Sequence, residues 1–428
     1  PEDRNLCEGL ISREECHNAV KNLQDNKSPG IDGLCAEFYK TFWSEIGNLL
    51  IDCFNESFQK GELSESQKLS ILSLIFKKTD RTQLKYYRPI SLATTDYKIL
   101  AFVLANRLNK VIAHIVSSDQ TGYIKGRFIG TNIRLINDII EHADRLNLGG
   151  AILFLDFEKA FDSLEWDFML KTLSYFNFGE NFIKWVEILY KNPKSMIKIN
   201  GWLSSKVSLT RGIRQGCPIS ALLFILAVET LALNIKQNPN IKGFCLNEQN
   251  QAEVKLSQYA DDTISILKEH TDIPEMLNAI SKFGDVSGLR LNLPKTEGIW
   301  LGHDRNNPDM YGIKFTNGPV RCLGIYVGHN KEECYKKNWI DKLEKFQKLL
   351  DCWRLRDLTL FGKVLIIKTL AVSQLVFSAT CCPVRDETKK QIVKLMYQFL
   401  WHKRDRIKRA ALICDFNEGG IRMIDIDS

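Results

Sequence analysis

The chain lacks the features that mark several specialised classes of protein. Its 12 cysteines include no CxxC spacing and no cluster with His, which argues against a zinc site and against a disulfide scaffold. No apolar run approaches the roughly 18 residues of a membrane span, so we expect no membrane contact. A basic and apolar leader, internal repeats and low-complexity tracts are also absent. Together these absences favour an intracellular protein with reduced, buried cysteines.

What is present is an ordinary globular composition. Hydrophobic residues make up 44% and charged residues 25% of the chain. Its 428 residues suffice for roughly two to four hydrophobic cores. The chain begins at Pro1 and not at Met, and it stops within a strand-like pattern at Ser428. We therefore expect a segment of a longer protein.

The charge is unevenly distributed along the chain. The net charge is +7, and residues 331–410 hold 19 Lys and Arg against 9 Asp and Glu, a local charge of +10 that leaves −3 for the remainder. Such a basic segment suits a clamp for a polyanion, next to a region in which carboxylates gather. A solvated helical face is the alternative explanation.

Hydrophobic periodicity predicts a strand-rich centre between two helical regions. The apolar run at 151–155 is typical of a central buried strand that ends at Asp156. Asp162 and Glu165 are predicted to form a capping box on the next helix. The other predicted helices are 10–60 with a Pro- and Gly-rich break at 28–33, and 96–117, 131–147, 218–231, 274–286, 339–350, 362–378 and 386–402. The other predicted strands are 69–90 as a hairpin with a basic turn, 196–200 with 205–209, 254–259 with 263–267, 298–301 and 322–327.

Two adjacent carboxylates, Asp261 and Asp262, mark the turn of one predicted hairpin. They repel each other, and a divalent cation such as Mg²⁺ or Mn²⁺ would compensate for that repulsion. If the strand that ends at Asp156 is a neighbour in the same sheet, three carboxylates meet at one edge, as two-metal phosphoryl transfer requires. The alternatives are ordinary turn chemistry for the pair and a strand-end aspartate for Asp156.

Several blocks of the sequence resemble those of non-LTR (LINE-type) retrotransposon reverse transcriptases, in order and in approximate spacing. The resemblance runs from about residue 20 to 402, which is nearly the whole chain. The polymerase blocks are Leu155–Asp162 (LDFEKAFD), Arg211–Pro218 (RGIRQGCP) and Tyr259–Asp262 (YADD). The further blocks are Ser28–Gly33 with Glu37–Lys40, Tyr87–Leu92, Asp119–Arg127 and Leu323–Val327.

The resemblance implies a role for each residue of the catalytic centre. Asp156, Asp261 and Asp262 correspond to the ligands of two Mg²⁺ ions, for which Mn²⁺ can substitute, and the carbonyl of Phe157 completes one metal shell. Phe161 occupies the aromatic gate position, where its ring would clash with a ribose 2′-hydroxyl. A core phenylalanine is the alternative for Phe161.

The resemblance also implies residues that bind the incoming dNTP. Gln215 and Gly216 match the loop that packs on the nascent base pair. Lys77 and Arg88 match the residues that grip the triphosphate. The register of Lys77 against Lys78 is open, because Phe76 stands where many relatives have proline. Lys295 is either the donor of a proton to the leaving pyrophosphate or a solvated loop lysine.

The implied architecture is α+β, a right-hand polymerase with fingers, palm and helical thumb. The expected parts are a helical extension (1–60), fingers (61–150), palm (151–330, with a loop near 211–220 that contacts the fingers), basic thumb (331–410) and the start of a linker (411–428). The thumb would hold the RNA–DNA hybrid, and its most basic run contains Lys403, Arg404, Arg406, Lys408 and Arg409. Ala221 replaces a proline that is frequent after the Gln-Gly block, which alters only the entry to the helix.

The expected activity is extension of a DNA primer on an RNA template, in target-primed reverse transcription. This setting implies action in the nucleus after assembly on the element's RNA in the cytoplasm. An endonuclease is expected upstream and a zinc-knuckle segment downstream. The alternatives are a reverse transcriptase of the group II intron or retron type, and a non-catalytic RNA-binding module with a polymerase fold.

Overall fold

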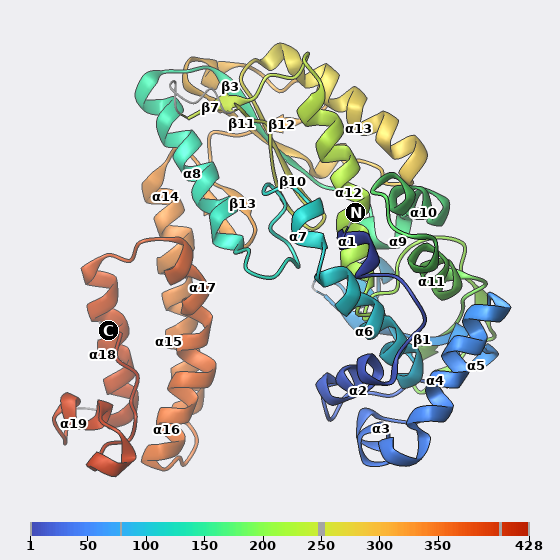
Figure 1. Ribbon diagram of the computed structural model, residues 1–428. Coiled ribbons are helices and arrows are strands. Elements are labelled where there is room, and N and C mark those ends of the chain that lie inside the picture. Colours follow the sequence, from blue (N-terminus) through green and yellow to red (C-terminus); the bar gives the residue numbers. More distant parts are fainter. Residues whose placement is uncertain (1, 78, 247–252, 402–404, 427–428) are drawn as a thin grey trace. The chain divides into compact units, whose positions relative to one another are not determined.

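The computed structural model describes residues 2–77, 79–246, 253–401 and 405–426, and it mixes helices with mainly antiparallel sheets (Figure 1). The chain forms two compact units. The first comprises residues 1–128, 152–296 and 310–313, and the second comprises 129–151, 297–309 and 314–428. The predicted α+β class is confirmed, whereas the division into extension, fingers, palm and thumb stays a prediction.

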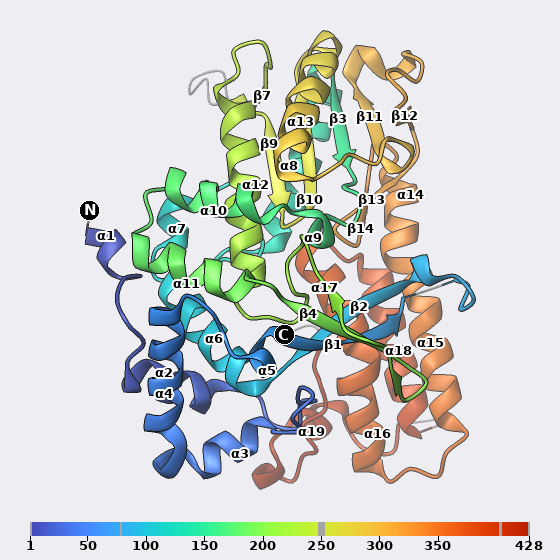
Figure 2. The same cartoon turned by 90° about the vertical axis from the view of Figure 1, so that its right-hand side faces the viewer.

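The N-terminal helices of the first unit pack around one another and on helix α6, Thr95–Asn109 (Figure 2). These helices are α1 (Glu2–Asn5), α2 (Arg13–Asn22), α3 (Ala36–Thr41), α4 (Trp43–Lys60) and α5 (Glu65–Lys68). The predicted break at 28–33 is confirmed, because it lies between α2 and α3. α4 ends at Gly61, which adopts the left-handed conformation that favours glycine.

A buried arginine ties the N-terminal segment to α6. The guanidinium of Arg107, 3% exposed, donates to both carboxylate oxygens of Glu15 at 2.6 and 2.8 Å. It also donates to the carbonyls of Cys7, Gly9 and Leu10 at 2.7–3.2 Å. Burial opposes ionisation of Glu15, but the bonds from Arg107 and from Ser12 prevail and lower its pKa. This pair is fully hydrogen-bonded, so removal of Arg107 leaves the half-buried Glu15 carboxylate without its cationic partner.

We expect Arg107→Met to lower the free energy of unfolding by about 3–5 kcal/mol at pH 7. The pKa of Glu15 is depressed in the folded protein, so the ionised carboxylate contributes its full stabilisation of the fold above the unfolded pKa of about 4.3. The difference in the free energy of unfolding between the parent and Arg107→Met should therefore shrink as the pH falls below that value. Urea unfolding at pH 7 and pH 3.5 measures it. Arg134→Met, which removes an exposed pair with Asp138, should cost less than about 1 kcal/mol. Equal costs for the two variants would contradict this account.

The first sheet of this unit contains the basic hairpin that the sequence predicts. Strand β1 (Leu69–Phe76) pairs antiparallel with β2 (Tyr87–Ala93) and parallel with β4 (Lys194–Ile199), as Figure 2 shows. The short β5 (Trp202–Leu203) and β6 (Val207–Ser208) both pair with β4, which confirms the second predicted hairpin. Buried hydroxyl groups of Ser91, Ser70 and Ser195 link the three long strands.

The second sheet carries the predicted carboxylates. Strand β3 (Gly150–Leu155) lies next to β10 (Asp262–Leu267), which pairs antiparallel with β9 (Leu256–Tyr259). The prediction that these strands are neighbours is confirmed. The remaining helices of the unit are α7 (Ile112–Ile115), α9 (Ala160–Ser163), α10 (Trp166–Tyr175), α11 (Glu180–Tyr190), α12 (Ser220–Gln237) and α13 (Ile273–Ser287).

Two local predictions are wrong. Asp162 does not cap a helix but lies inside α9, since Lys159 adopts a left-handed conformation (φ 44°) and turns the chain early. Glu165 instead precedes α10 and makes no side-chain cap. Residues 322–327 form a hairpin of β13 (Val320–Cys322) and β14 (Ile325–Val327), because Leu323 and Gly324 both have positive φ.

The second unit combines short strands with a C-terminal bundle of helices. β11 (Glu297–Leu301) pairs parallel with β12 (Lys314–Phe315), and α8 (Ile129–Leu146) packs on β11 and β14. The bundle consists of α14 (Lys331–Tyr335), α15 (Asp341–Arg354), α16 (Leu360–Ile366), α17 (Ser373–Cys381), α18 (Asp386–Trp401) and α19 (Arg409–Ile413). Helices α15, α16 and α18 lie side by side around Phe346, Ile367 and Phe399 (Figure 1). The predicted helices of this region are confirmed.

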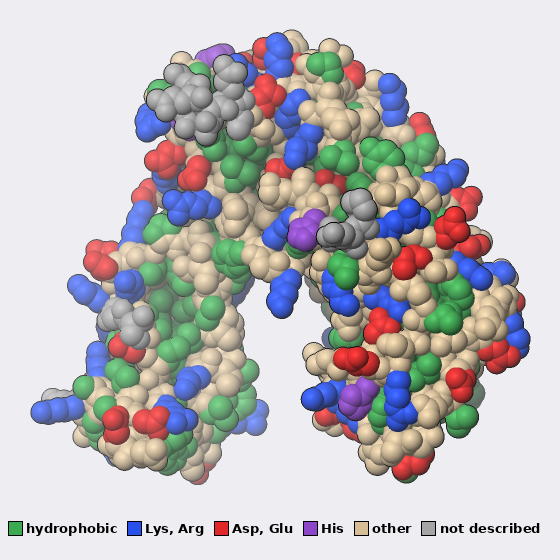
Figure 3. All heavy atoms as spheres, viewed as in Figure 1, with side chains coloured by type: hydrophobic (Ala, Val, Ile, Leu, Met, Phe, Trp, Pro, Cys, Tyr) green, Lys and Arg blue, Asp and Glu red, His purple; other side chains and the backbone are tan. Residues whose placement is uncertain are grey.

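Two helical stretches among the described residues are long and apolar enough to cross a membrane, Ser220–Gln237 and Leu360–Cys381. Neither is an uninterrupted apolar run. The first is a core helix, of which 67% is buried, whereas 33% of the second is buried. Hydrophobic side chains accordingly show on the surface of the C-terminal bundle (Figure 3).

Candidate active site

The turn that joins β9 to β10 presents two of the predicted carboxylates. Tyr259 and Asp262 face each other in the last register pair, so Ala260 and Asp261 form a two-residue turn. Ala260 has a φ of +55°, a left-handed conformation that costs a residue with a side chain about 1 kcal/mol or more. The surrounding structure must therefore hold this turn in place.

A buried glutamine holds the turn. The Oε1 atom of Gln120 accepts hydrogen bonds from the amides of Ala260 and Gly122 at 2.8 and 2.9 Å, and its Nε2 donates to the Ala260 carbonyl at 3.4 Å. The backbone of residues 119–121 also bonds to Gln258 on β9. A Cβ atom on Gly122 would lie 2.6 Å from the Ala260 nitrogen, so only glycine fits. The Asp119–Arg127 block thus supports the turn, a role that its sequence does not reveal.

The third carboxylate is held by the segment that follows α13. The Asp156 carbonyl accepts from the Asn292 amide at 2.7 Å, and the Asp156 amide donates to Thr296 Oγ1 at 3.4 Å. Phe157 is buried and forms a bridge with Leu291, which fixes the backbone beside Asp156. The Nζ atom of Lys295 lies 3.7 Å from Asp156 Oδ2, with both side chains substantially exposed. The predicted role of Lys295 as a proton donor stays a prediction.

Asp156, Lys77 and Arg88 affect the pKa values of the two carboxylates at the turn. Burial, followed by repulsion from Asp261 and Asp156, raises the pKa of Asp262 to about 6, although Lys77 opposes the shift. Burial and Asp156 also raise the pKa of Asp261, while Arg88 and Lys77 oppose that shift. Lys77 and Arg88 of the β1–β2 hairpin thus act electrostatically on the carboxylates at the turn. Lys78 lies outside the described residues.

The chemistry of this donor set suits a divalent cation, although the side chains do not form a closed coordination shell. Across the part of the chain that the structure describes, no three His, Cys, Asp or Glu side chains are grouped closely enough to hold a metal ion. Burial, and then repulsion between the carboxylates, nevertheless raises the pKa of Asp261 and of Asp262, so their ionised forms are unfavourable here. A bound cation would remove that cost, because hard oxygen ligands suit Mg²⁺ and Mn²⁺.

Hydrogen bonds connect three segments that carry predicted nucleotide-binding residues: α9, the loop before α12, and β2. The Phe161 ring stacks on Phe224 at 4.5 Å and an interplanar angle of 17°. The Phe161 carbonyl accepts from Ile213 at 2.7 Å, and Gln215 Nε2 donates to Asp162 Oδ1 at 3.0 Å. The Gln215 carbonyl accepts from Ser91 on β2, which links this loop to the strand that carries Arg88.

Glycine at position 216 is required by its backbone. Gly216 has a φ of +102°, and a Cβ atom there would lie 3.2 Å from the Ser91 carbonyl. This close approach is to the protein's own backbone, so the predicted approach of Gly216 to the nascent base pair stays a prediction. The nucleotide-contacting roles of Phe161, Gln215 and Gly216 stay predictions.

The predicted nucleic-acid-binding run lies in the second unit. Arg406, Lys408 and Arg409 are exposed, whereas Lys403 and Arg404 lie outside the described residues. Arg409 pairs with Asp405 at 2.8 Å and lies over the Tyr397 ring at 4.3 Å. These contacts leave the binding role of the run as a prediction.

Comparison with known proteins gives the following matches. Residues 75–327 match a family described as reverse transcriptase (RNA-dependent DNA polymerase). The chain is 32% identical over 423 residues (98% of its length) to the transposon TX1 uncharacterized 149 kDa protein of Xenopus laevis. It is 26% identical over 63% of its length to a retrovirus-related Pol polyprotein from the type-2 retrotransposable element R2DM of Drosophila melanogaster.

The chain spans 32% and 24% of these two relatives, so each of them is a much longer protein. A solved structure of apo telomerase from Candida tropicalis, truncated from its C-terminal domain, aligns with a TM-score of 0.44 and 12% identity. That alignment covers 67% of this chain and 58% of the telomerase chain.

Proposed function

Because this chain belongs to the reverse transcriptase family, we propose that it extends the 3′-hydroxyl of a DNA primer on an RNA template with deoxynucleoside triphosphates. The right-hand polymerase fold and the RNA-directed DNA polymerase activity predicted from the sequence are those of this family. The observation that carries the proposal is the position of Asp261 and Asp262 at the turn beside the strand that ends before Asp156, with Lys77 and Arg88 opposing the rise in the pKa of Asp261.

Members of this family use divalent metal ions. In this chain, Asp156, Asp261, Asp262 and the Phe157 carbonyl would hold two Mg²⁺ ions, with Mn²⁺ as a substitute. When bound, the ions would favour ionisation of the primer hydroxyl and offset charge on the leaving pyrophosphate. Lys77 and Arg88 would bind and orient the triphosphate through charge-assisted hydrogen bonds.

The remaining residues of the site would position the substrates. Gln215, held by Asp162, would pack against the nascent base pair, and Gly216 would let the backbone approach it. Lys295 would deliver a proton to the pyrophosphate. The exposed cations Arg406, Lys408 and Arg409, with Lys403 and Arg404, would contact the backbone of the RNA–DNA hybrid, so binding should weaken steeply with salt.

The biological setting proposed here is target-primed reverse transcription by a LINE-type element, in the nucleus, after assembly on the element's RNA in the cytoplasm. The matches to proteins of transposon TX1 and of an R2 element support this over a group II intron or retron enzyme. A non-catalytic RNA-binding module is disfavoured because it would gain nothing from keeping mutually repelling carboxylates.

The test is primer extension by the purified chain on a DNA primer annealed to an RNA template. We expect incorporation of dNTPs with Mg²⁺ or Mn²⁺, none with EDTA, and a steep decline as salt is raised. Template-dependent incorporation should be lost when the RNA template is omitted. An active preparation that extends primers only without a template, or that binds RNA and never incorporates dNTPs, would refute the proposal.

Substitution of Phe161 tests the gate. Phe161→Val should raise incorporation of ribonucleotides relative to deoxynucleotides by about tenfold or more, because the ring that would meet the 2′-hydroxyl is removed. The ratio of kcat/KM for dNTP and rNTP measures the effect. Phe168→Val, which removes a ring packed on Phe283 in the same unit, is the matched control and should leave the ratio unchanged. An unchanged ratio in Phe161→Val would remove the gate role.

A further inference from the structure

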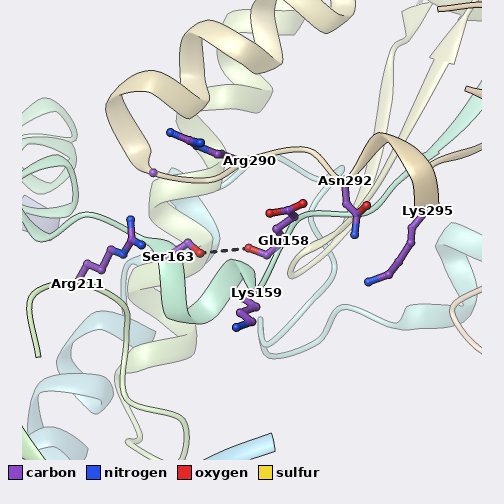
Figure 4. Close-up of a pocket in the computed structure, with 8 residues that line it drawn as sticks. Glu158, Lys159, Ser163, Arg211, Arg290, Asn292 and Lys295 are labelled. Atoms are coloured by element: carbon purple, nitrogen blue, oxygen red, sulfur yellow. Dashed lines mark hydrogen bonds between the residues drawn. The ribbon is translucent and has the colours of Figure 1, made fainter. Parts of the chain in front are cut away.

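A basic cavity of about 490 Å³ lies beside the loop that holds Asp156 (Figure 4). Its walls come from the turn into α9, from the loop before α12 and from the segment after α13. Four cationic side chains and one carboxylate line it, together with Ser163, Gly288 and Asn292. The charged residues are Lys159, Arg211, Arg290, Lys295 and Glu158.

The cationic side chains that line this cavity make few ion pairs with the described carboxylates. Within the described chain, no carboxylate lies at ion-pair distance from Lys159 or Arg290, and Arg211 makes one long contact of 3.5 Å with Glu165. Lys295 is 3.7 Å from Asp156. All four cations are exposed, so solvent screens their mutual repulsion and their charged groups are accessible to an anion.

The walls of the cavity are preformed. The amide of Glu158 donates to the Arg290 carbonyl at 2.8 Å, and Ser163 Oγ donates to the Glu158 carbonyl at 3.1 Å (Figure 4). A Cβ atom on Gly288 would lie 2.4 Å from the Ser163 carbonyl, and Gly288 has a φ of +80°. The two segments therefore meet backbone to backbone, which fixes the positions from which the cationic side chains extend.

One residue connects this cavity with the candidate active site. Lys295 lines the cavity and also approaches the Asp156 carboxylate, while its neighbour Asn292 binds the Asp156 carbonyl. An anion released at Asp156 would thus meet Lys295 first and the guanidinium groups of Arg290 and Arg211 beyond it. The lining contains no aromatic ring to stack on a base.

We propose that this cavity binds inorganic pyrophosphate, the second product of the reaction, on its way from the active site. This inference rests on the proposed function. A compact polyanion suits a cavity whose lining has a net charge of +3, because guanidinium groups bind phosphate oxygens bidentately. The phosphodiester backbone of a nucleic acid would instead need an open, extended groove.

The experiment is calorimetric titration of the whole chain with sodium pyrophosphate in EDTA, where no metal complex can bind the aspartates. The parent should bind pyrophosphate, and Arg290→Gln should weaken binding about tenfold. Arg211→Gln is the second variant and should also weaken it, which guards against misfolding of the first. Lys282→Gln, an equal loss of charge at an exposed position on α13, is the matched control and should bind like the parent.

Each outcome is decisive. The cavity proposal is overturned if the parent does not bind pyrophosphate, or if the parent and both arginine variants bind it equally. In either case, primer extension by the parent would leave the polymerase proposal standing. Equal weakening in Lys282→Gln shows general attraction to a basic protein and also overturns it. If the parent binds pyrophosphate through Arg290 but never extends a primer, the polymerase function fails, and the cavity is then an anion site without the role of product exit.

Discussion

Replacement of Asp261 and Asp262 together by alanine should abolish deoxynucleotide incorporation on an RNA template. The two side chains contribute most of the negative charge at the turn, and loss of metal binding there should slow the chemical step by at least about a thousandfold. Single-turnover extension with saturating primer–template measures this step directly. Asp285→Ala removes an exposed carboxylate from α13 and is the matched control. A double variant as active as the parent would exclude these residues from catalysis.

Substitution of Asp262 should raise the free energy of unfolding, although it lowers the activity. The folded pKa of Asp262 is raised to about 6, so the folded state binds more protons than the unfolded state between about pH 4 and pH 6. The cost of the ionised group therefore accumulates as the pH rises through that window and is complete above it. In metal-free buffer at pH 7.5, Asp262→Asn should raise the free energy of unfolding by on the order of 1 kcal/mol, a figure reduced for solvent screening because the side chain is only partly buried. At pH 4 the substitution should change the free energy of unfolding by almost nothing. A merely structural aspartate would lose stability on substitution.

Local pattern was enough to predict the strands that carry the carboxylates. The apolar run before Asp156 and the alternating patterns around Asp261 each predict a strand from nearby residues alone. The structure places these strands side by side. The same holds for the basic hairpin at Lys77 and Arg88. In these places the sequence within a few residues determines the element, and the burial of one strand between neighbours determines the partner.

Other features depend on residues that are distant in sequence. Asp162 has the spacing of a helix cap, yet the left-handed Lys159 ends the preceding loop early, so the carboxylate binds Gln215 instead. Leu323 and Gly324 reverse the chain inside a run that alternates like a strand. Such positions are set by backbone conformations that non-glycine residues rarely adopt, and periodicity does not report them.

The contact between Gly122 and the turn that carries Asp261 and Asp262 is the strongest case of such a distant dependence, and it leads to a specific prediction. In Gly122→Ala, the added methyl group would lie 2.6 Å from the Ala260 nitrogen, and that nitrogen is backbone and cannot rotate away. The Gln120 bond to Ala260 must then lengthen, and Asp261 and Asp262 must move with the turn. A displacement of about 1 Å at a reacting centre costs about 100-fold in rate. We therefore expect Gly122→Ala to lower kcat at least about 100-fold, with the KM for primer–template unchanged.

The same variant should remain folded, since overpacking of this kind costs about 1–3 kcal/mol. Activity must be measured below the melting transition of the variant, with circular dichroism as the check. Gly47→Ala is the matched control, because its added methyl group meets only the Trp43 side chain at 3.0 Å or more within helix α4. A raised Mg²⁺ requirement in Gly122→Ala would separate a displaced metal-binding turn from general loss of structure. If Gly122→Ala polymerises as fast as Gly47→Ala, the turn does not depend on this contact, and the left-handed Ala260 must be held by the β9–β10 hairpin alone.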